Sequence, residues 1–338
     1  MIKIENVEVV GWEAAIRGMR NPMNSWDKSD SIFSKHVCSN TVCWTDISLN
    51  ELPPCNIPEE VHVDNWTGLF YNIGPKDYNL MMKLRNAGTD HRKFMRMIVV
   101  YVDITAPLYW WKEFDTYKVG TVANSCSTMH KIHEKEFTLE DFSCEHLISE
   151  PYDIDNDDPI DGEFKDDGLV LVSNNSNGWL GHCYHTASGN RCVEYLAPKT
   201  LLDKYVISAL NACREAYLKT KRDLYLEREK ALNMNTSEPM ADVEKLQEKQ
   251  KLYWWQMIQL LPSSYNQKRT VMLNYEVLAN IYKSRKNHKL DEWRDFCKWI
   301  ESLPYSELIT GASLKDIPIC NEIMEEAKRR VTNGEDKK

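Results

Sequence analysis

The segment from Phe94 to Val119 reads "FMRMIVVYVDITAPLYWWKEFDTYKV" and joins a strand signal to a helix signal. Its first part alternates and then becomes almost wholly apolar, with several β-branched residues, which is typical of a strand covered on both faces. Its second part predicts a helix, because Thr105 can cap it and Pro107 falls in the first turn, where a missing N–H costs nothing. We expect this helix to end at Gly120.

The residues before this segment predict one further helix and an irregular beginning. The stretch "GPKDYNLMMKLRNAG", Gly74 to Gly88, has apolar residues at helical spacing and closes on a glycine. Residues 1 to about 70 mix short apolar alternations with turn residues and the proline-bounded "NELPPCNIPEE". We therefore expect an irregular N-terminal part.

The second half of the chain is predicted to be mainly helical. Residues 145–198 are acidic and rich in turn residues around one short strand, "GLVLVS", so we interpret them as an insertion on the surface rather than a second core. Helical patterns follow at Lys199 to about Leu232, Asp242 to Leu261, Lys268 to Arg285 and Asp291 to Leu303. Together these patterns predict a single α+β domain over residues 1–338, with helices dominating its C-terminal half.

Composition limits the classes of function. The chain is 42% hydrophobic and 28% charged, which is the balance of a soluble globular protein. Its net charge of −9 disfavours a nucleic-acid polymer as partner, because such binding relies on Lys and Arg displacing counterions. No apolar run has the length of a signal peptide or a membrane helix, so we expect no membrane partner and a cytoplasmic location.

The cysteines predict neither disulfides nor a metal site. Ten of them are scattered along the chain, a pattern that favours reduced thiols. The cluster "GHCYHTASGNRC", His182 to Cys192, lacks the paired two-residue spacings of common zinc sites, and the group His36, Cys38 and Cys43 is a weaker candidate still. We predict no bound metal.

Three stretches have residue types suited to an anionic ligand, and each also has an ordinary structural interpretation. The loop "GTVANSCSTMHK", 120–131, offers hydroxyls and backbone N–H groups beside cations, but it can equally be a polar turn. The turn "NAGTDHRKF", 86–94, can hold a ligand or be a solvated basic turn. On the predicted helix 268–285, Asn274 and Arg285 are three turns apart and can share one face, which can also be a plain solvated face.

In order, these stretches resemble the flavin-dependent thymidylate synthases, ThyX. The chain has "NAGTDHRKF", the strand "MIVVYVDI", then "APLYWWKEFDTYKVGTVANSCSTMH", and much later "LLPSSYNQKRTVMLNYEVLANIYKSRKNHKLDEW". Pro262 to Asn274 is twelve residues and Asn274 to Arg285 is eleven, as in the family, while His288 and Glu292 follow at the family's spacing with one residue missing before them. The resemblance covers residues 75–131 and 250–305, about a third of the chain.

The same alignment also shows departures from the family pattern. The Arg-His-Arg that marks the family is here Thr116-Tyr117-Lys118, or Tyr117-Lys118-Val119 if a residue is inserted later, and the glutamate after Asn124 is Ser125. Loss of two guanidinium groups removes bidentate contacts that a lysine cannot replace. These changes bear directly on flavin binding, which in the family is associated with those basic residues.

The resemblance implies a fold, a reaction and a set of site residues. The fold would be a central antiparallel or mixed sheet flanked by helices, assembled as a homotetramer, and the reaction would methylate dUMP to dTMP or a related pyrimidine nucleotide with FAD, NADPH and methylenetetrahydrofolate. Arg285 would be the catalytic residue, holding the nucleotide's charge or polarising its base. The resemblance also assigns substrate binding to Asn124, Ser125, Ser127, Arg285 and Glu113, and cofactor binding to His91, Lys112, Lys118, Asn274 and His288.

Three functions remain open from the sequence. The first is the flavin-dependent methylase, which predicts a yellow protein. The second is a flavin-free descendant that binds a nucleotide without redox chemistry and is colourless. The third is a structural or regulatory oligomer of viral, phage-type origin in which the two "YWW" patches, 109–111 and 253–255, are subunit contacts. We favour the first.

Overall fold

The structure is a computed structural model of the chain, and it describes residues 2–39, 42–45, 67–147, 149, 168–174, 177–185, 191–195, 197–234 and 240–311. Its helices and antiparallel sheets confirm the α+β class. The chain divides into two compact units. The first unit holds Thr105–Glu113 and Ser125–Lys268, and the second holds Ile2–Ile104, Phe114–Asn124 and Arg269–Lys338. A single domain over residues 1–338 stays a prediction.

Two sheets contain most of the strands of the second unit. A four-stranded sheet has the order β1-β5-β10-β6, with bounds Lys3–Val10, Val99–Pro107, Asn266–Asn274 and Thr121–Ser125. An antiparallel three-stranded sheet has the order β3-β2-β4, with bounds Val42–Thr45, Ile32–Ser39 and Thr67–Asn72. The strand predicted after Phe94 is therefore present as β5, although it is preceded by a 3-10 helix over Arg92–Met97.

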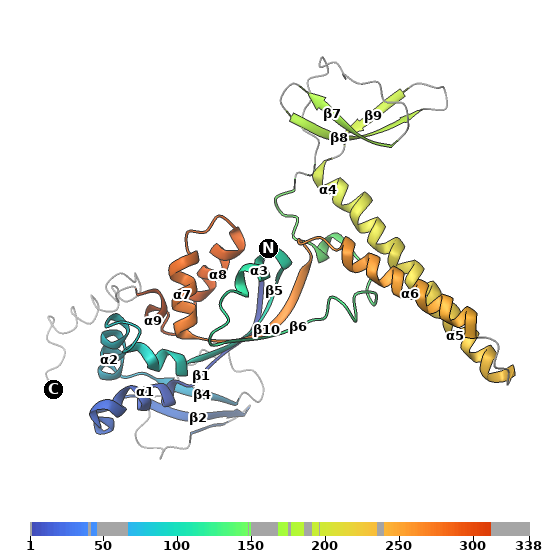
Figure 1. The fold of residues 1–338 in the computed structure, drawn as a ribbon. Coiled ribbons are helices and arrows are strands. Elements are labelled where there is room, and N and C mark those ends of the chain that lie inside the picture. The colour runs from blue at the N-terminus through green and yellow to red at the C-terminus, as the bar shows by residue number, and fades with distance from the viewer. Residues whose placement is uncertain are drawn as a thin grey trace. The chain divides into compact units, whose positions relative to one another are not determined.

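The helices of the second unit are mostly short. They are α1 (Trp12–Arg20), α2 (Pro75–Asn86), α7 (Tyr275–Arg285), α8 (Asp291–Glu301) and α9 (Glu307–Thr310). Helix α2 begins at a proline and Gly88 follows it with φ of 109°, as the glycine stop predicts. Helices α7, α8 and α9 pack on one another (Figure 1).

The core of the second unit is built from the apolar faces of these elements. The apolar residues of α8, predicted from the pattern in 291–303, are indeed buried, and so is the apolar stripe of α7. The largest fully buried side chains of the unit are Trp293, Tyr275, Phe114, Phe296, Met81, Met95, Ile98 and Ile104. Trp293, Phe114 and Phe296 contact one another, with ring centroids 6.0 to 6.5 Å apart. This aromatic cluster packs α8 against Phe114, the last residue of α3.

Two predictions about local structure were wrong. The N-terminal part is not irregular where the structure describes it, since Lys3–Val10 is a strand and Trp12–Arg20 a helix with five buried residues. The helix predicted from Thr105 to Gly120 is only α3, Leu108–Phe114, because β5 continues through Pro107. Pro107 is the last residue of β5.

The first unit contains a long helical pair and a small sheet. Helix α5 (Ser208–Met234) follows α4 (Pro198–Leu201) and a π-helical turn, Leu202–Ile207, and lies side by side with α6 (Met240–Leu260) (Figure 1). These helices agree with the patterns from Lys199 onward. The strands β7 (Gly168–Asn174), β8 (Asn177–His185) and β9 (Arg191–Tyr195) form an antiparallel sheet, where the sequence predicted one strand.

The first unit has its own apolar cluster. It joins segment 132–142 to the π-helical turn, α5 and α6 through buried Ile132, Phe137, Phe142, Leu202, Ile207, Leu210 and Met257. Trp110 and Trp111 of α3 are fully buried, and the Trp111 indole donates to the Gln267 carbonyl at 2.9 Å.

Within the described ranges, no helix is long and apolar enough to cross a membrane.

Candidate functional site

Helix α7 begins at a residue that the sequence singled out, but not in the predicted way. Residues 266–274 form strand β10 rather than the first part of a helix, and Asn274 is the N-cap of α7. Its Oδ1 accepts from the Val277 N–H at 3.0 Å, which satisfies one of the otherwise unpaired donors of the first turn. Alternation in "QKRTVML" and its β-branched residues explain the strand. Asn274 and Arg285 are therefore the two ends of α7.

The loop after α3 contacts the first end of α7. The amide Nδ2 of Asn274 lies 3.5 Å from the Gly120 carbonyl, to which it donates. Gly120 has φ of 80°, and a Cβ at this position would lie 2.7 Å from that same Nδ2. Glycine is therefore required twice at Gly120, for its backbone conformation and for the close approach of Asn274.

The same loop contacts the other end of α7 through Tyr117. Arg285 Nε donates to the Tyr117 hydroxyl at 3.0 Å, and the Arg285 guanidinium carbon lies 4.7 Å from the centre of the Trp293 ring. Such a stacked cation is attracted by the negative face of the ring. The guanidinium is half-buried and fixed in orientation by two aromatic residues.

His288 completes this end of the helix and introduces an electrostatic conflict. Its Nε2 lies 3.0 Å from Arg285 Nη1, while its Nδ1 accepts from the Leu290 N–H at 3.2 Å. A neutral imidazole has one acceptor nitrogen, so one of these two donors faces an N–H of the ring.

A buried carboxylate, Glu276, lies in the first turn of α7. Glu276 pairs with Arg92, with Nε and Oε1 3.3 Å apart, and makes a very short contact with Arg96. Burial acts to raise the pKa of Glu276, but hydrogen bonds and charge from these arginines outweigh it and hold the pKa below its usual value. The basic turn of the sequence analysis is thus partly neutralised by α7.

The remaining predicted residues are distributed over both units. In the second unit, His91, Lys118 and Asn124 are exposed. In the first unit, Lys112 is exposed and Glu113 half-buried on α3, while Ser125 and Ser127 are exposed. The Ser127 hydroxyl accepts from the backbone N–H groups of Met129 and His130 at 3.1 and 2.9 Å, so this part of the loop is an ordinary hydroxyl-stabilised turn.

Of the five residues that the resemblance assigns to a flavin, two are hydrogen-bonded within the protein and three are exposed. The Asn274 amide is bonded at both its oxygen and its nitrogen, and His288 is bonded to its own neighbours. His91, Lys112 and Lys118 are exposed. Flavin binding by these five residues stays a prediction.

The sequence reasoning missed the residues that hold Arg285. From the sequence, Tyr117 is only a replacement within the family motif, and Trp293 is only one residue of the helix predicted from Asp291 to Leu303. A tryptophan eight positions after the arginine, one turn into the next helix, was a usable signal, because the α7–α8 turn brings that ring back to the guanidinium. The side chains of His182 to Cys192 and of Cys38 and Cys43 lie outside those described.

No protein-family model matches the chain, and no curated protein does. Among solved structures, two of flavin-dependent thymidylate synthase ThyX from Helicobacter pylori with FAD and dUMP are 14% and 13% identical, cover 91% and 92% of this chain and 99% and 98% of theirs, and give a TM-score of 0.43 each. The UMP/dUMP methylase PolB from Streptomyces cacaoi, bound with 5-Br dUMP, is 10% identical over 96% of this chain and 95% of its own, with a TM-score of 0.39. At these values the likenesses establish neither activity nor ligand.

Proposed function

We propose that this protein binds a pyrimidine deoxynucleotide of the dUMP type, with Arg285 as the principal contact to the nucleotide. The observation that carries the proposal is the position of the loop after α3. This loop stands where the ThyX-like order of motifs has its nucleotide and cofactor residues, and it touches both ends of α7, Gly120 at Asn274 and Tyr117 at Arg285.

The physical role of each residue follows from these contacts. Tyr117 and Trp293 hold the guanidinium plane in one orientation, so little conformational entropy is lost when an oxyanion or a carbonyl oxygen of the base binds. Asn274 acts indirectly, because it caps α7 and anchors the loop that carries Tyr117. Asn274 is therefore a positioning residue.

Transfer of a carbon to the base is a finer proposal than nucleotide binding. It requires FAD, NADPH and methylenetetrahydrofolate, as the resemblance implies, and the flavin-binding residues of the motif are altered in this chain. Flavin absorbance in the visible spectrum of the purified protein would support it, and a colourless protein that binds dUMP would support the flavin-free alternative. The homotetramer and the cytoplasmic location stay predictions of the same kind.

Isothermal titration calorimetry with dUMP tests the binding proposal. Arg285→Ala should weaken dUMP binding by roughly tenfold or more, since hydrogen bonds to charged groups contribute about 1.5–3 kcal/mol each. Arg285→Lys should rescue only part of the affinity, because lysine lacks the planar fork.

Lys298→Ala is the control. Lys298 is an exposed cation on the neighbouring helix α8, where it pairs with Asp295 within its own turn. Its loss should leave dUMP affinity unchanged. If Arg285→Ala melts like the wild type and binds dUMP equally well, the proposal is wrong.

A further inference from the structure

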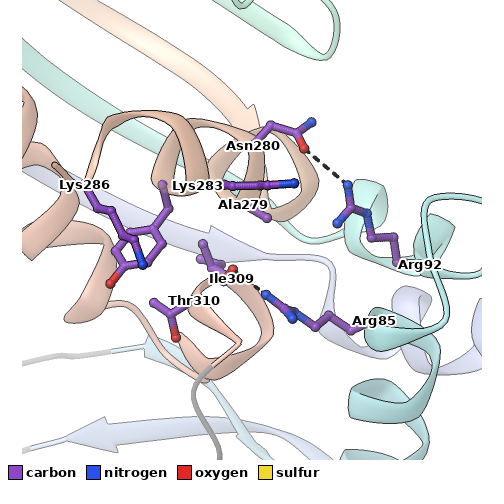
Figure 2. A pocket seen from close by; sticks show the side chains of 9 residues that line it. Arg85, Arg92, Ala279, Asn280, Lys283, Lys286, Ile309 and Thr310 are labelled. Carbon is purple, nitrogen blue, oxygen red and sulfur yellow. Dashed lines mark hydrogen bonds between the residues drawn. The ribbon is translucent and has the colours of Figure 1, made fainter. Parts of the chain in front are cut away.

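A second cationic site lies on another side of α7, in the second unit. It is a cavity of about 190 Å3 between the end of α2, the 3-10 helix at Arg92–Met97, α7 and α9. Figure 2 shows its side chains converging from these elements. It is lined by Arg85, Arg92, Ala279, Asn280, Tyr282, Lys283, Lys286, Ile309 and Thr310.

The lining of this cavity is positive without a lining acid. Four of its residues are cations, and none is Asp or Glu. Arg92 is neutralised from outside the cavity by Glu276. For the other three cations, Arg85, Lys283 and Lys286, no ion pair with an acid occurs within the ranges that the structure describes.

Arg85 is fixed in place by neutral groups alone. Its Nε and Nη2 donate to the carbonyls of Leu308 and Ile309 at 3.1 Å each, and its Nη1 donates to the Asn86 side chain at 3.0 Å. These acceptors orient the guanidinium but leave its positive charge uncompensated. Burial and, to a lesser extent, repulsion from the charge of Arg92 lower the pKa of Arg85.

The other cations extend from one side of α7 into the same space. Lys283 and Lys286 are three positions apart, so they are neighbours on the helix surface, and like charges at this spacing repel. Asn280 on the previous turn accepts from Arg92 at 3.2 Å and keeps its amide N–H groups as further donors (Figure 2). The Tyr282 hydroxyl donates to Glu301, outside the lining. An arrangement that concentrates cations and donors costs folding energy unless an anion binds.

We propose that this cavity binds an oxyanion of the phosphate class, held by Arg85, Lys283 and Lys286. Its volume lies below the roughly 300–1,000 Å3 of pockets for drug-sized ligands, so it suits a single phosphate or pyrophosphate group rather than a whole nucleotide. The site is separate from Arg285, because Lys283 precedes it by two residues and so points roughly 200° around the helix. The proposal does not depend on nucleotide binding at Arg285.

Calorimetry with inorganic phosphate and with pyrophosphate, at constant ionic strength, tests the site. The wild type should bind at least one of them, and Lys283→Ala should weaken that binding about tenfold by removing one charged contact. Lys283→Glu should abolish it. Because Lys283 is exposed, both variants should fold, which their melting temperatures will show.

The matched control is Lys76→Ala, which removes an exposed lysine from the first turn of α2, at the other end of the helix from Arg85. It should bind phosphate as the wild type does. No binding of either anion by the wild type, or equal loss of affinity in Lys76→Ala and Lys283→Ala, overturns the proposal.

A dUMP titration separates the two sources of phosphate. If Lys283→Ala weakens phosphate but leaves dUMP unchanged, the cavity takes the free anion and the two sites are independent. If Lys283→Ala weakens dUMP while Arg285→Ala does not, the cavity takes the phosphate of a nucleotide, and the role proposed for Arg285 is wrong. Both outcomes support the cavity as an oxyanion site.

Discussion

Two charged regions of the second unit are built on opposite principles. In the first, α1 and α2 are joined by Arg20 and Asp77, whose side chains are 5% and 0% exposed and lie 2.6 Å apart. Arg20 also donates to the carbonyls of Ser25 and Lys28, and Asp77 accepts from the hydroxyls of Ser29 and Ser31. In the second, the cavity beside α7, Arg85, Lys283 and Lys286 gather without an acid in the lining.

The comparison separates a structural use of charge from a binding use. Every strong hydrogen-bonding atom of the Arg20–Asp77 pair is matched by the chain itself, so the pair has nothing to offer a ligand. Burial alone would raise the pKa of Asp77, but hydrogen bonds from Ser29, Ser31 and Arg20, with the charge of Arg20, lower it. In the cavity the opposite holds. Arg85 is oriented by neutral acceptors, and the positive charges of Arg85, Lys283 and Lys286 are not compensated by an acid in the lining.

The largest expected effect is the loss of stability when the Arg20–Asp77 ion pair is broken. Asp77→Asn removes the charge that neutralises a buried guanidinium, and breaking a buried ion pair in this way typically costs about 3–5 kcal/mol. We therefore expect a lowered urea midpoint and melting temperature. Asp27→Asn, at an exposed acid in the same N-terminal region, is the control and should change neither. A stable Asp77→Asn protein would show that the pair is dispensable and would remove the contrast between the two regions.

The same pair predicts a dependence on pH with a definite sign. Because the folded-state pKa of Asp77 lies below its ordinary value of 3.8, its contribution is fully present above that pH and is lost as the pH falls through the depressed folded-state value. The melting temperature of the wild type should therefore fall below about pH 4. That of Asp77→Asn should fall less steeply over the same range, and parallel curves would contradict this assignment.

Local signals in the sequence were enough for the elements with a strong period. The amphipathic pattern and Gly88 gave α2 its bounds, and the apolar stripe of 291–303 gave α8. The pattern failed where tertiary pairing decides. Residues 268–274 have the pattern of a helix start because Val271 and Tyr275 fall at helical spacing, yet these residues belong to strand β10, and Asn274 marks the change from strand to helix.

Of the candidate site, the sequence predicted only the two residues at the ends of α7. Spacing drew attention to Asn274 and Arg285, and the structure places the loop of Gly120 and Tyr117 against both. The partners of Arg285 and the cavity beside Lys283 arise from contacts between elements far apart in the chain. Arg85 and Lys283, for example, are separated by nearly two hundred residues, and no local pattern connects them.

A smaller effect on stability is expected at Glu276, which forms an ion pair with a cation of the cavity. Its carboxylate neutralises Arg92, the one compensated cation of the cavity. Glu276→Gln should destabilise the protein by about 1–3 kcal/mol, the cost of leaving the arginine partners of Glu276 unsatisfied, and should strengthen phosphate binding because the charge of Arg92 is no longer compensated by a carboxylate. Asn280→Ala, which removes a neutral partner of Arg92, is the control and should not strengthen binding. Unchanged phosphate affinity in Glu276→Gln would show that Arg92 does not act on the anion.

The smallest expected effect is a gain in stability, and it tests most directly whether the cations of the cavity serve binding and not the fold. Lys283→Gln removes one cation from a cavity that lacks an acid, at a position where glutamine forms helix about as well as lysine. Relief of repulsion from Lys286 should stabilise the unliganded protein by about 0.2–0.5 kcal/mol, seen as a slightly raised melting temperature in phosphate-free buffer. Added phosphate should reverse the order, because only the wild type gains stability from the bound anion. If Lys283→Gln melts at a lower temperature than the wild type without phosphate, Lys283 stabilises the fold as Arg20 does. The cavity would then use its charge for structure, like the Arg20–Asp77 ion pair, and not for binding.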